Sequence, residues 1–382
     1  MTLSQVSTTQ IDHLLRELWD REGSDLLLTA GAPPMMRVNG ELHPIPGAAS
    51  LTVEEAEKLV YSVLTDEVRE EFEHGREADF SFSWRDLTRF RANVFHQQGA
   101  VALSLRVIPY QIPTFDELGL PPVMEYFCGL NQGLVLLTGP TGSGKSTTLA
   151  SMIDLINTRR RLHILTLEDP VEYVHTHKLS VVNQREVGFD TISFARGLRS
   201  ALREDPDVVL VGEMRDPESI QTTLTIAETG HLVFATLHTN DASTALDRIV
   251  DVFPSERQAQ IRTQLAASLA GVVAQRLIPR YGGGMVASFE ILLANSAVRG
   301  LIREGKSHQI RNVISQSVRE GMQTLEQSLS VLVTHGLISY DDALARSVVP
   351  KEIRPPAMPQ AVAGTAPPAA PAGLPPHVAA EG

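Results

Sequence analysis

The segment GPTGSGKS, residues 139–146, is the feature that most constrains the fold of this chain of 382 residues. It matches the pattern G-x-x-x-x-G-K-[ST], whose glycines let backbone N–H groups turn inward around phosphate oxygens. An apolar run of strand length, residues 134–138, precedes it, and a helical stretch to about residue 157 follows it. A strand, a glycine-rich loop and a helix N-terminus in this order predict a nucleotide site, because the helix dipole favours an anion there.

Two side chains at the end of this segment have separate tasks. Lys145 supplies a point charge for the β- and γ-phosphates, and the hydroxyl of Ser146 is a ligand for Mg²⁺. The expected ligands are therefore a nucleotide and Mg²⁺. The residues expected to bind the nucleotide are Gly139, Pro140, Thr141, Gly142, Ser143, Gly144, Lys145, Ser146 and Thr147, with Ser146 as the metal ligand.

A carboxylate is also needed, because hydrolysis requires an acidic group that orients water and helps to hold the metal. Residues 207–213 predict a buried strand that ends in the carboxylate of Glu213. Open α/β sheets bind ligands at the carboxyl ends of their strands. Glu213 is therefore predicted to act as the general base or to position the attacking water.

Two further polar residues end predicted strands. Glu168 follows the apolar run 163–167 and is expected to reach the metal through water, the alternative being a simple turn before Pro170. His238 follows the run 232–237. It either senses the γ-phosphate or an adjacent subunit, or it has only a structural role.

The apolar runs alternate with segments of helix length, which predicts an α/β fold with a parallel sheet between helices. This pattern covers residues 123–350 and ends, from residue 295, in helices only. Residues 1–112 predict a smaller α+β domain, because a helical periodicity at 11–22 is followed by short strand-like runs. Residues 113–122 predict a proline-rich linker, and residues 351–382, with 8 Pro and 9 Ala, predict a disordered tail.

The composition excludes several classes of protein. The net charge is −12 and aromatic residues make up 5%, which disfavours a RecA-like nucleic-acid motor with its basic, aromatic strand faces. No apolar run reaches the roughly 18 residues of a membrane-spanning helix, and the N-terminus lacks the pattern of a secretory signal. The single cysteine, Cys128, excludes a disulfide framework and a cysteine-ligated zinc site.

Four segments in order resemble the nucleotide-site boxes of the secretion ATPases, the motors of type IV pili and type II secretion. They are the glycine-rich loop, LEDPVEY at 167–173, REDPDVVLVGEMRD at 203–216 and TGHLVFATLHTNDA at 229–242. The resemblance is nearest to the pilus retraction branch. Between Arg276 and Glu290 there is no room for a four-cysteine zinc insert, and residues 297–306, AVRGLIREGK, are similar to the retraction signature.

This resemblance implies a PAS-like N-terminal domain, a RecA-like ATPase domain and a homo-hexamer that hydrolyses ATP to power pilus retraction and twitching motility. It implies a cytoplasmic protein that meets the inner face of the membrane only through partners, among them the inner-membrane pilus platform protein, and that binds no nucleic acid. An extension or secretion motor and an accessory retraction paralogue remain alternatives, and a nucleic-acid motor is a remote one.

The resemblance also assigns residue roles. Glu213 is expected to be the catalytic glutamate, Glu168 the acid of the second box, and His238 the histidine of the fourth. Arg91 and Arg106 resemble the arginines that reach the γ-phosphate, the alternative being a pair of solvated strand residues. Three arginines spaced on one predicted helical face either meet a neighbouring subunit or form a solvated basic face: Arg196, Arg199 and Arg203.

Overall fold

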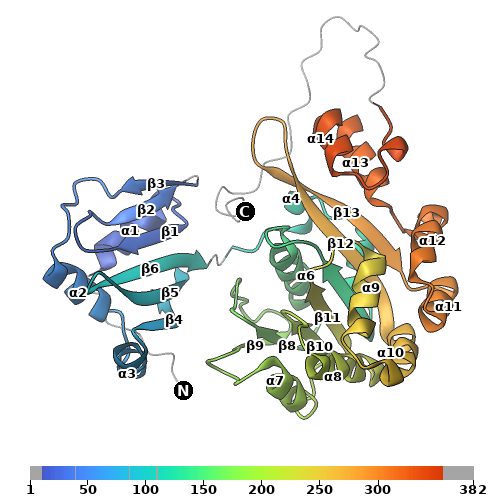
Figure 1. Cartoon of the computed structure of the whole chain (residues 1–382), viewed down its shortest axis with the longest axis horizontal. Helices are drawn as coiled ribbons and strands as arrows, with labels where there is room; N and C mark the ends of the chain where they lie inside the picture. Colours follow the sequence, from blue (N-terminus) through green and yellow to red (C-terminus); the bar gives the residue numbers. More distant parts are fainter. Residues whose placement is uncertain (1–10, 39, 86, 109–110, 356–382) are drawn as a thin grey trace, which may run out of the picture. The chain divides into compact units, whose positions relative to one another are not determined.

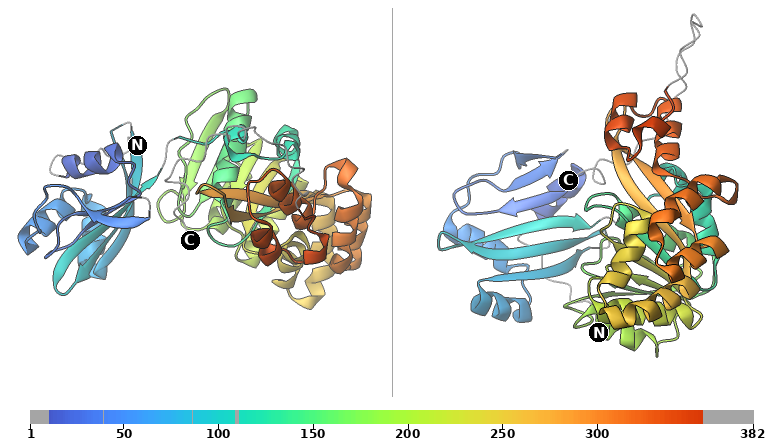
Figure 2. Two further views of the ribbon diagram at one scale, coloured as in Figure 1. Left: turned by 90° about the horizontal axis from the view of Figure 1, so that it is seen from above. Right: turned by 45° about the vertical axis from the view of Figure 1, so that its right-hand side comes forward.

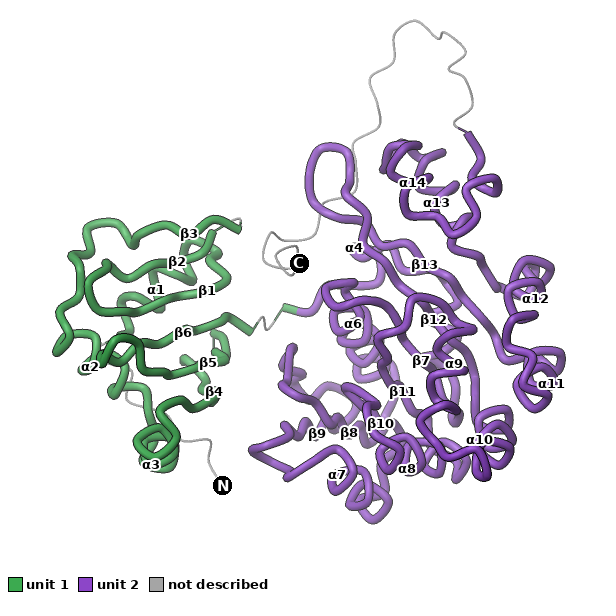
Figure 3. Tube along the Cα trace, viewed as in Figure 1, with its two compact units in different colours: residues 1–111, 375–380 green, residues 112–374, 381–382 purple. Residues whose placement is uncertain are grey.

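The computed structural model describes residues 11–38, 40–85, 87–108 and 111–355. They fall into two compact units, one up to Gln111 and the other from Ile112 onward (Figure 3). Among these residues no helix is long and apolar enough to cross a bilayer.

Unit 1 is an antiparallel sheet with helices on one face (Figure 1). The strand order is β3-β2-β1-β6-β5-β4. The strands are β1 Asp25–Leu28, β2 Met35–Val38, β3 Glu41–Pro44, β4 Glu77–Trp84, β5 Thr88–Gln97 and β6 Ala100–Ile108, and the helices are α1 Asp12–Asp20, α2 Val53–Tyr61 and α3 Asp66–Gly75.

Local chemistry explains where the helices of unit 1 begin. At α2 the backbone N–H of Thr52 donates to the Glu55 carboxylate at 2.8 Å, and the N–H of Glu55 donates to the Thr52 hydroxyl at 3.2 Å. This capping box is the one that the sequence predicts. Two elements are absent from the prediction: β3 is exposed along its whole length and has no apolar alternation, and α3 buries only Val68 and Phe72.

Unit 2 is built on a seven-stranded sheet in the order β13-β12-β7-β11-β10-β8-β9. All neighbouring strands are parallel except β12 and β13, which form an antiparallel pair. The strands are β7 Gly133–Thr138, β8 His163–Glu168, β9 Val181–Glu186, β10 Val208–Val211, β11 Leu232–Leu237, β12 Leu269–Pro279 and β13 Met285–Leu293.

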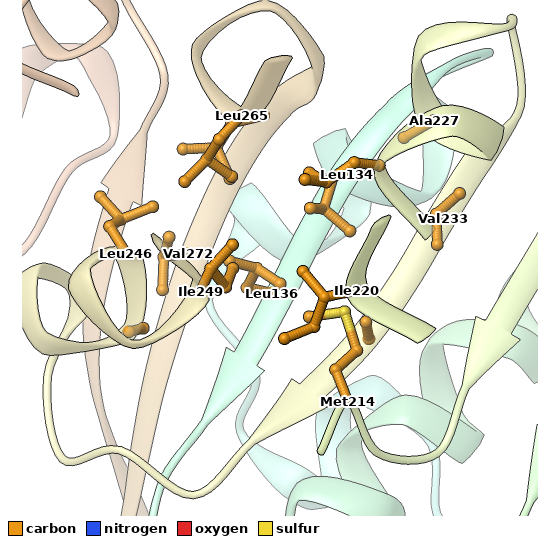
Figure 4. Close-up of a cluster of buried hydrophobic side chains, with 14 of the residues drawn as sticks. Leu134, Leu136, Met214, Ile220, Ala227, Val233, Leu246, Ile249, Leu265 and Val272 are labelled. Carbon is orange, nitrogen blue, oxygen red and sulfur yellow. The ribbon is translucent and has the colours of Figure 1, made fainter. Parts of the chain in front are cut away.

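Helices cover both faces of this sheet (Figure 2). Alternate residues of one strand therefore enter different cores: Leu134 and Leu136 pack in the cluster of Figure 4, whereas Val135 and Leu137 pack against α6 on the other face. This two-sided burial is why the central strands are continuously apolar. The helices are α5 Pro122–Gly129, α6 Lys145–Arg159, α7 Phe194–Ala201, α8 Pro217–Glu228, α9 Ala242–Asp251 and α10 Ser255–Ser268.

The predicted α/β class and the four predicted central strands are confirmed, but the sheet is larger than predicted. Strand β9 and the β12–β13 hairpin are additional, and β13 departs from the parallel pattern. Residues 113–122 also differ from the linker expected there. They contain the short helix α4, Phe115–Leu118, and the side chains of Phe115 and Leu120 pack against the core of unit 2.

The C-terminal part is helical, as predicted, and it is ordered beyond the expected boundary at residue 350. Ile353 is buried in a cluster with Leu325 and Leu329, and Glu352 pairs with Arg311 at 2.7 Å. Residues 356–382, the rest of the predicted disordered tail, lie outside the described residues. The helices of this part are α11 Ser296–Glu304, α12 Ile310–Gln316, α13 Leu325–Thr334 and α14 Tyr340–Arg346.

The carboxylate of Glu326 holds this C-terminal segment in place. Its side chain is 0% exposed and pairs with Arg311 at 2.8 Å. It also accepts the backbone N–H groups of Val348 at 2.8 Å and Val349 at 2.9 Å. Burial raises the pKa of Glu326, but the N–H of Val349 and the Arg311 guanidinium outweigh it, so that the pKa lies below its usual value.

Glu326→Gln is therefore expected to lower the free energy of unfolding by about 1–3 kcal/mol at pH 7, because a neutral amide loses the ion pair. The ionised carboxylate stabilises the fold above its unfolded-state pKa, so the difference from wild type should shrink as the pH falls below about 4.5. Calorimetric melting of both proteins across this range checks it. Glu352→Gln, at an exposed partner of the same arginine, should cost less than about 1 kcal/mol, and an equal cost for both variants would contradict the assignment.

Candidate functional site

The glycine-rich loop lies between the end of β7 and the start of α6, and its backbone leaves no room for side chains at two positions. Gly139 has φ +150° and Gly144 has φ +80°. A Cβ at Gly139 would stand 2.3 Å from the backbone carbonyl oxygen of Gln275. A Cβ at Gly144 would stand 2.9 Å from the side-chain Nε2 atom of the same glutamine. Only glycine fits at these places, which explains their position in the motif.

Lys145 is the first residue of α6, and its ammonium group lies inside the loop. It donates to the carbonyl oxygens of Gly139 and Pro140, both at 2.9 Å. Burial lowers the pKa of Lys145, while the carboxylates of Glu172 and Glu213 act in the opposite direction. The buried ammonium group therefore interacts electrostatically with two acidic side chains.

The hydrogen-bond donors of the loop also suit a phosphate group. Within the described part of the chain, the hydroxyl of Ser143 is buried and has no hydrogen-bond partner. A buried hydroxyl without a partner is unfavourable unless a ligand satisfies it. This hydroxyl, the ammonium of Lys145 and the N-terminus of α6 form a donor set suited to an anion.

The predicted acidic residues and the histidine lie along one edge of the sheet, beside this loop. Strands β7, β11, β10 and β8 are adjacent and parallel, so their carboxyl ends lie along one edge. Glu168 is the last residue of β8, Glu213 follows β10, and His238 follows β11 directly. The Nε2 atom of His238 is 3.3 Å from the carboxylate of Glu213.

Glu213 is held as an ionised carboxylate. Its second partner is Arg215, whose Nε lies 2.7 Å from Oε1. Partial burial raises the pKa of Glu213, but the hydrogen bond from Arg215 and the interaction with His238 outweigh it, and the pKa lies below its usual value. An ionised acceptor at a strand end can take a hydrogen bond from a water molecule.

Glu168 has a different environment, although it lies at the same edge of the sheet. Its Oε1 accepts hydrogen bonds from the Thr166 hydroxyl at 2.6 Å and from the Gln184 amide at 3.1 Å. Burial dominates these contacts and raises the pKa of Glu168 to about 7. The two strand-end glutamates therefore have pKa values shifted in opposite directions.

Threonine hydroxyls join the loops that carry these groups. The hydroxyl of Thr138, at the end of β7, donates to the carbonyl of Thr239 at 2.6 Å, which fixes the loop after His238. The hydroxyl of Thr236 donates to the carbonyl of Gly212, directly before Glu213. Hydroxyls of β7 and β11 thus fix the backbone next to His238 and Glu213.

Sequence reasoning missed four contributors to the site. Glu172 acts on the charge of Lys145, and the hydroxyl of Tyr173 lies 3.0 Å from that of Thr147. Both belong to the LEDPVEY segment and were detectable there. Arg215 stands two residues after Glu213 and has the same kind of local signal. Gln275 has none, because its role depends on β12 lying beside β7.

Arg91 and Arg106 lie in unit 1 and are not part of the constellation that the strands of unit 2 build. They are direct cross-strand neighbours on β5 and β6. Both are exposed, and Arg106 pairs with Asp25 at 3.0 Å. The two arginines therefore lie side by side on neighbouring strands of the sheet.

The expected face of three arginines is only partly present. Helix α7 ends at Ala201, so Arg203 lies beyond the helix that should carry it. Arg199 pairs with Glu218 of the same chain. Arg196 is exposed on α7. The helical spacing that grouped them is broken by the turn after α7, which sequence periodicity did not reveal.

Glu168→Gln is expected to remove a pH dependence of stability. Between pH 4.5 and about 7 the folded protein keeps a proton on Glu168 that the unfolded chain releases, so wild-type stability falls as the pH rises through this window. The amide keeps both hydrogen-bond acceptor contacts and does not titrate. Relative to wild type, the variant should gain about 2–3 kcal/mol between pH 5 and pH 7.5 in nucleotide-free melting; a difference independent of pH would contradict the assignment.

Comparison with known proteins identifies the family and the relatives of this chain. Residues 89–344 match the family model described as type II/IV secretion system protein. The type IV pilus retraction ATPase PilT of Pseudomonas aeruginosa is 49% identical over 328 residues, covering 86% of this chain and 95% of that protein. The type IV pilus ATPase PilU of the same organism is 41% identical over 346 residues, covering 90% of each chain.

A solved structure agrees with these matches. The crystal structure of the pilus retraction motor PilT with bound ADP has a TM-score of 0.85 and 49% identity, and the match covers 90% of this chain and 98% of that one. The resemblance to the retraction branch that the sequence motifs indicate is thereby confirmed. This chain belongs to the type II/IV secretion system protein family.

Proposed function

We propose that this chain is the protomer of a hexameric, Mg²⁺-dependent motor that hydrolyses ATP to power type IV pilus retraction. One observation carries this proposal: Lys145 in the glycine-rich loop, Glu168, Glu213 and His238 converge at one sheet edge. The chain has 49% identity to proteins named for pilus retraction and twitching motility.

The chain's own residues divide the chemistry. The backbone N–H groups of the loop and the ammonium of Lys145 bind the phosphates of the substrate, and the hydroxyl of Ser143 adds a donor. Ser146, and Glu168 through water, would hold Mg²⁺, which supplies positive charge to the phosphoryl oxygens when bound. Glu213 accepts a hydrogen bond from the attacking water and orients it. Arg215 and His238 keep that carboxylate ionised and aimed.

Arg91 and Arg106 are assigned to the γ-phosphate. Guanidinium groups stay charged and bind phosphate oxygens in pairs, which suits a contact that forms with ATP and is lost with ADP. A contact made with only one nucleotide state shifts the balance between two arrangements of the units. Binding and hydrolysis would thus alternate between a closed and a released form.

The assembly follows from the same proposal. The partners are five further copies of the chain and, in the cell, the inner-membrane pilus platform protein. The protein would be cytoplasmic and reach the inner face of the membrane only through that machinery. Arg196 and Arg203 are assigned to contacts with a neighbouring copy.

Glu213→Gln should lower ATP turnover by about 100-fold or more, because the amide cannot take the water proton as a carboxylate does. Its affinity for ATP should stay within about threefold of wild type, since the loop that binds the phosphates is untouched. Steady-state hydrolysis and nucleotide titration measure both. Glu218→Gln, at an exposed glutamate of α8 paired with Arg199, is the matched control and should hydrolyse ATP normally.

In cells, deletion of the gene should leave excess surface pili that never retract, and only the wild-type gene, not Glu213→Gln, should restore retraction. Counting pili and observing live retraction tests this. Cells without pili would assign the chain to extension instead. Unchanged pili would favour an accessory role. This role is the second candidate function because the chain is 41% identical to PilU.

Arg91→Gln and Arg106→Gln should each lower turnover about tenfold or more, and leave ADP affinity unchanged, because the proposed contact is with the γ-phosphate alone. Arg69→Gln is the control, since Arg69 of α3 lies over the ring of Tyr61 of α2, on the helix-covered side of the sheet. Loss of ADP affinity in the two strand variants would argue against a γ-phosphate role.

A further inference from the structure

We infer that Gln275 is a positioning residue for the phosphate-binding loop, a role that rests on the proposed ATP binding by that loop. Its side-chain amide donates to the carbonyl of Ser143 at 2.8 Å, and its amide oxygen accepts the hydroxyl of Thr148 at 2.9 Å. One buried side chain thus holds the loop and the helix that follows it.

The strand register places Gln275 at this position. Strands β12 and β7 are parallel neighbours, and Ala274 of β12 pairs with Thr138, the last residue of β7. The next residue along β12 therefore lies beside Gly139, where the loop begins. The carbonyl of Gln275 approaches that glycine so closely that a Cβ there would stand 2.3 Å away.

The two contacts bracket the part of the chain that receives the phosphate. Ser143 precedes Gly144, the N-cap of α6, and Thr148 lies one turn into the helix, where its N–H donates to the carbonyl of Gly144 at 3.0 Å. The free N–H groups of a helix N-terminus lie in this first turn. Gln275 therefore fixes the carbonyl of Ser143, which precedes these N–H groups, and the side chain of Thr148, which follows them.

Both ends of the amide are committed to the loop and its helix. Gln275 is 2% exposed and Thr148 is also 2% exposed, so neither partner has water as a substitute. If the amide is lost, the Ser143 carbonyl and the Thr148 hydroxyl lose their partners in a buried place, which is costly. A loop that relaxes to satisfy them no longer presents its N–H groups in one arrangement, and binding must then restore it at a cost in affinity.

The test compares Gln275→Met, which keeps the length of the side chain without its polar ends, with wild-type protein. We expect ADP and ATP to bind about tenfold more weakly, with turnover at saturating ATP within about threefold of wild type. Thr148→Val removes one of the two bonds and should weaken nucleotide binding by about threefold. The double variant should bind no more weakly than Gln275→Met alone, because both changes act on one linkage.

The matched control is Gln323→Met. Gln323 donates to the carbonyl of Phe289 at 3.2 Å, so its partner lies on β13 and not on the loop or α6, and nucleotide affinity should be unchanged. Melting without nucleotide separates affinity from stability: a merely structural role predicts a lower melting temperature with normal affinity in the folded protein.

Each outcome decides the inference. ADP affinity of Gln275→Met within about twofold of wild type, in a folded protein, overturns it. If that variant does not fold, Thr148→Val decides in the same way: normal affinity overturns the inference and weakened affinity supports it. Wild-type protein that binds neither ADP nor ATP overturns the proposed function and the inference together, a result distinguishable from failure of the variant alone.

Discussion

The close packing of β7 between β11 and β12 is the constraint on which the rest of unit 2 depends. It aligns the end of β7 with His238 on one side and with Gln275 on the other. The glycine-rich loop has to leave the sheet between these two neighbours, and the backbone of β12 excludes any side chain at Gly139. The shape of the loop is therefore imposed by the sheet as much as by its own glycines.

The same parallel order sets the electrostatics of the site. Two glutamates stand at the ends of neighbouring strands, yet Glu213 pairs with Arg215 and His238, whereas Glu168 accepts hydrogen bonds from a hydroxyl and an amide and is repelled by the carboxylate of Glu172. Their pKa values move apart, the one downward and the other to about 7. Carboxyl groups separated in this way can take different tasks. An ionised Glu213 suits the proposed orientation of water, whereas Glu168, with a pKa of about 7, would hold the proposed Mg²⁺ through water in its ionised form.

Local signals were sufficient for much of this arrangement. The continuous apolar runs predicted β7, β8, β10 and β11, and parallel order then brought their carboxyl ends together. Features that depend on residues far apart in the sequence were not predicted. One is the hairpin of β12 and β13. The other is the role of Gln275, whose partners Thr148 and Ser143 precede it by 127 and 132 positions. The prediction of an arginine face on α7 was only partly right for a related reason. Periodicity shows which residues share a helix face, but it does not show at which residue the helix ends.

Unit 1 raises a separate energetic argument. Its helices cover one face of the sheet, and the other face carries a row of charged cross-strand neighbours: Arg37, Asp25, Arg106 and Arg91. Asp25 lies 3.6 Å from Arg37 and 3.0 Å from Arg106, while no ion pair of Arg91 is found among the described residues.

Exposed ion pairs contribute only about 0–1 kcal/mol. Loss of the exposed pair between Arg106 and Asp25 would by itself cost little, and no carboxylate pairs with Arg91 among the described residues. A row with one acid among three bases is poorly balanced by itself. It is well suited to an anion that is present in one nucleotide state and absent in the next.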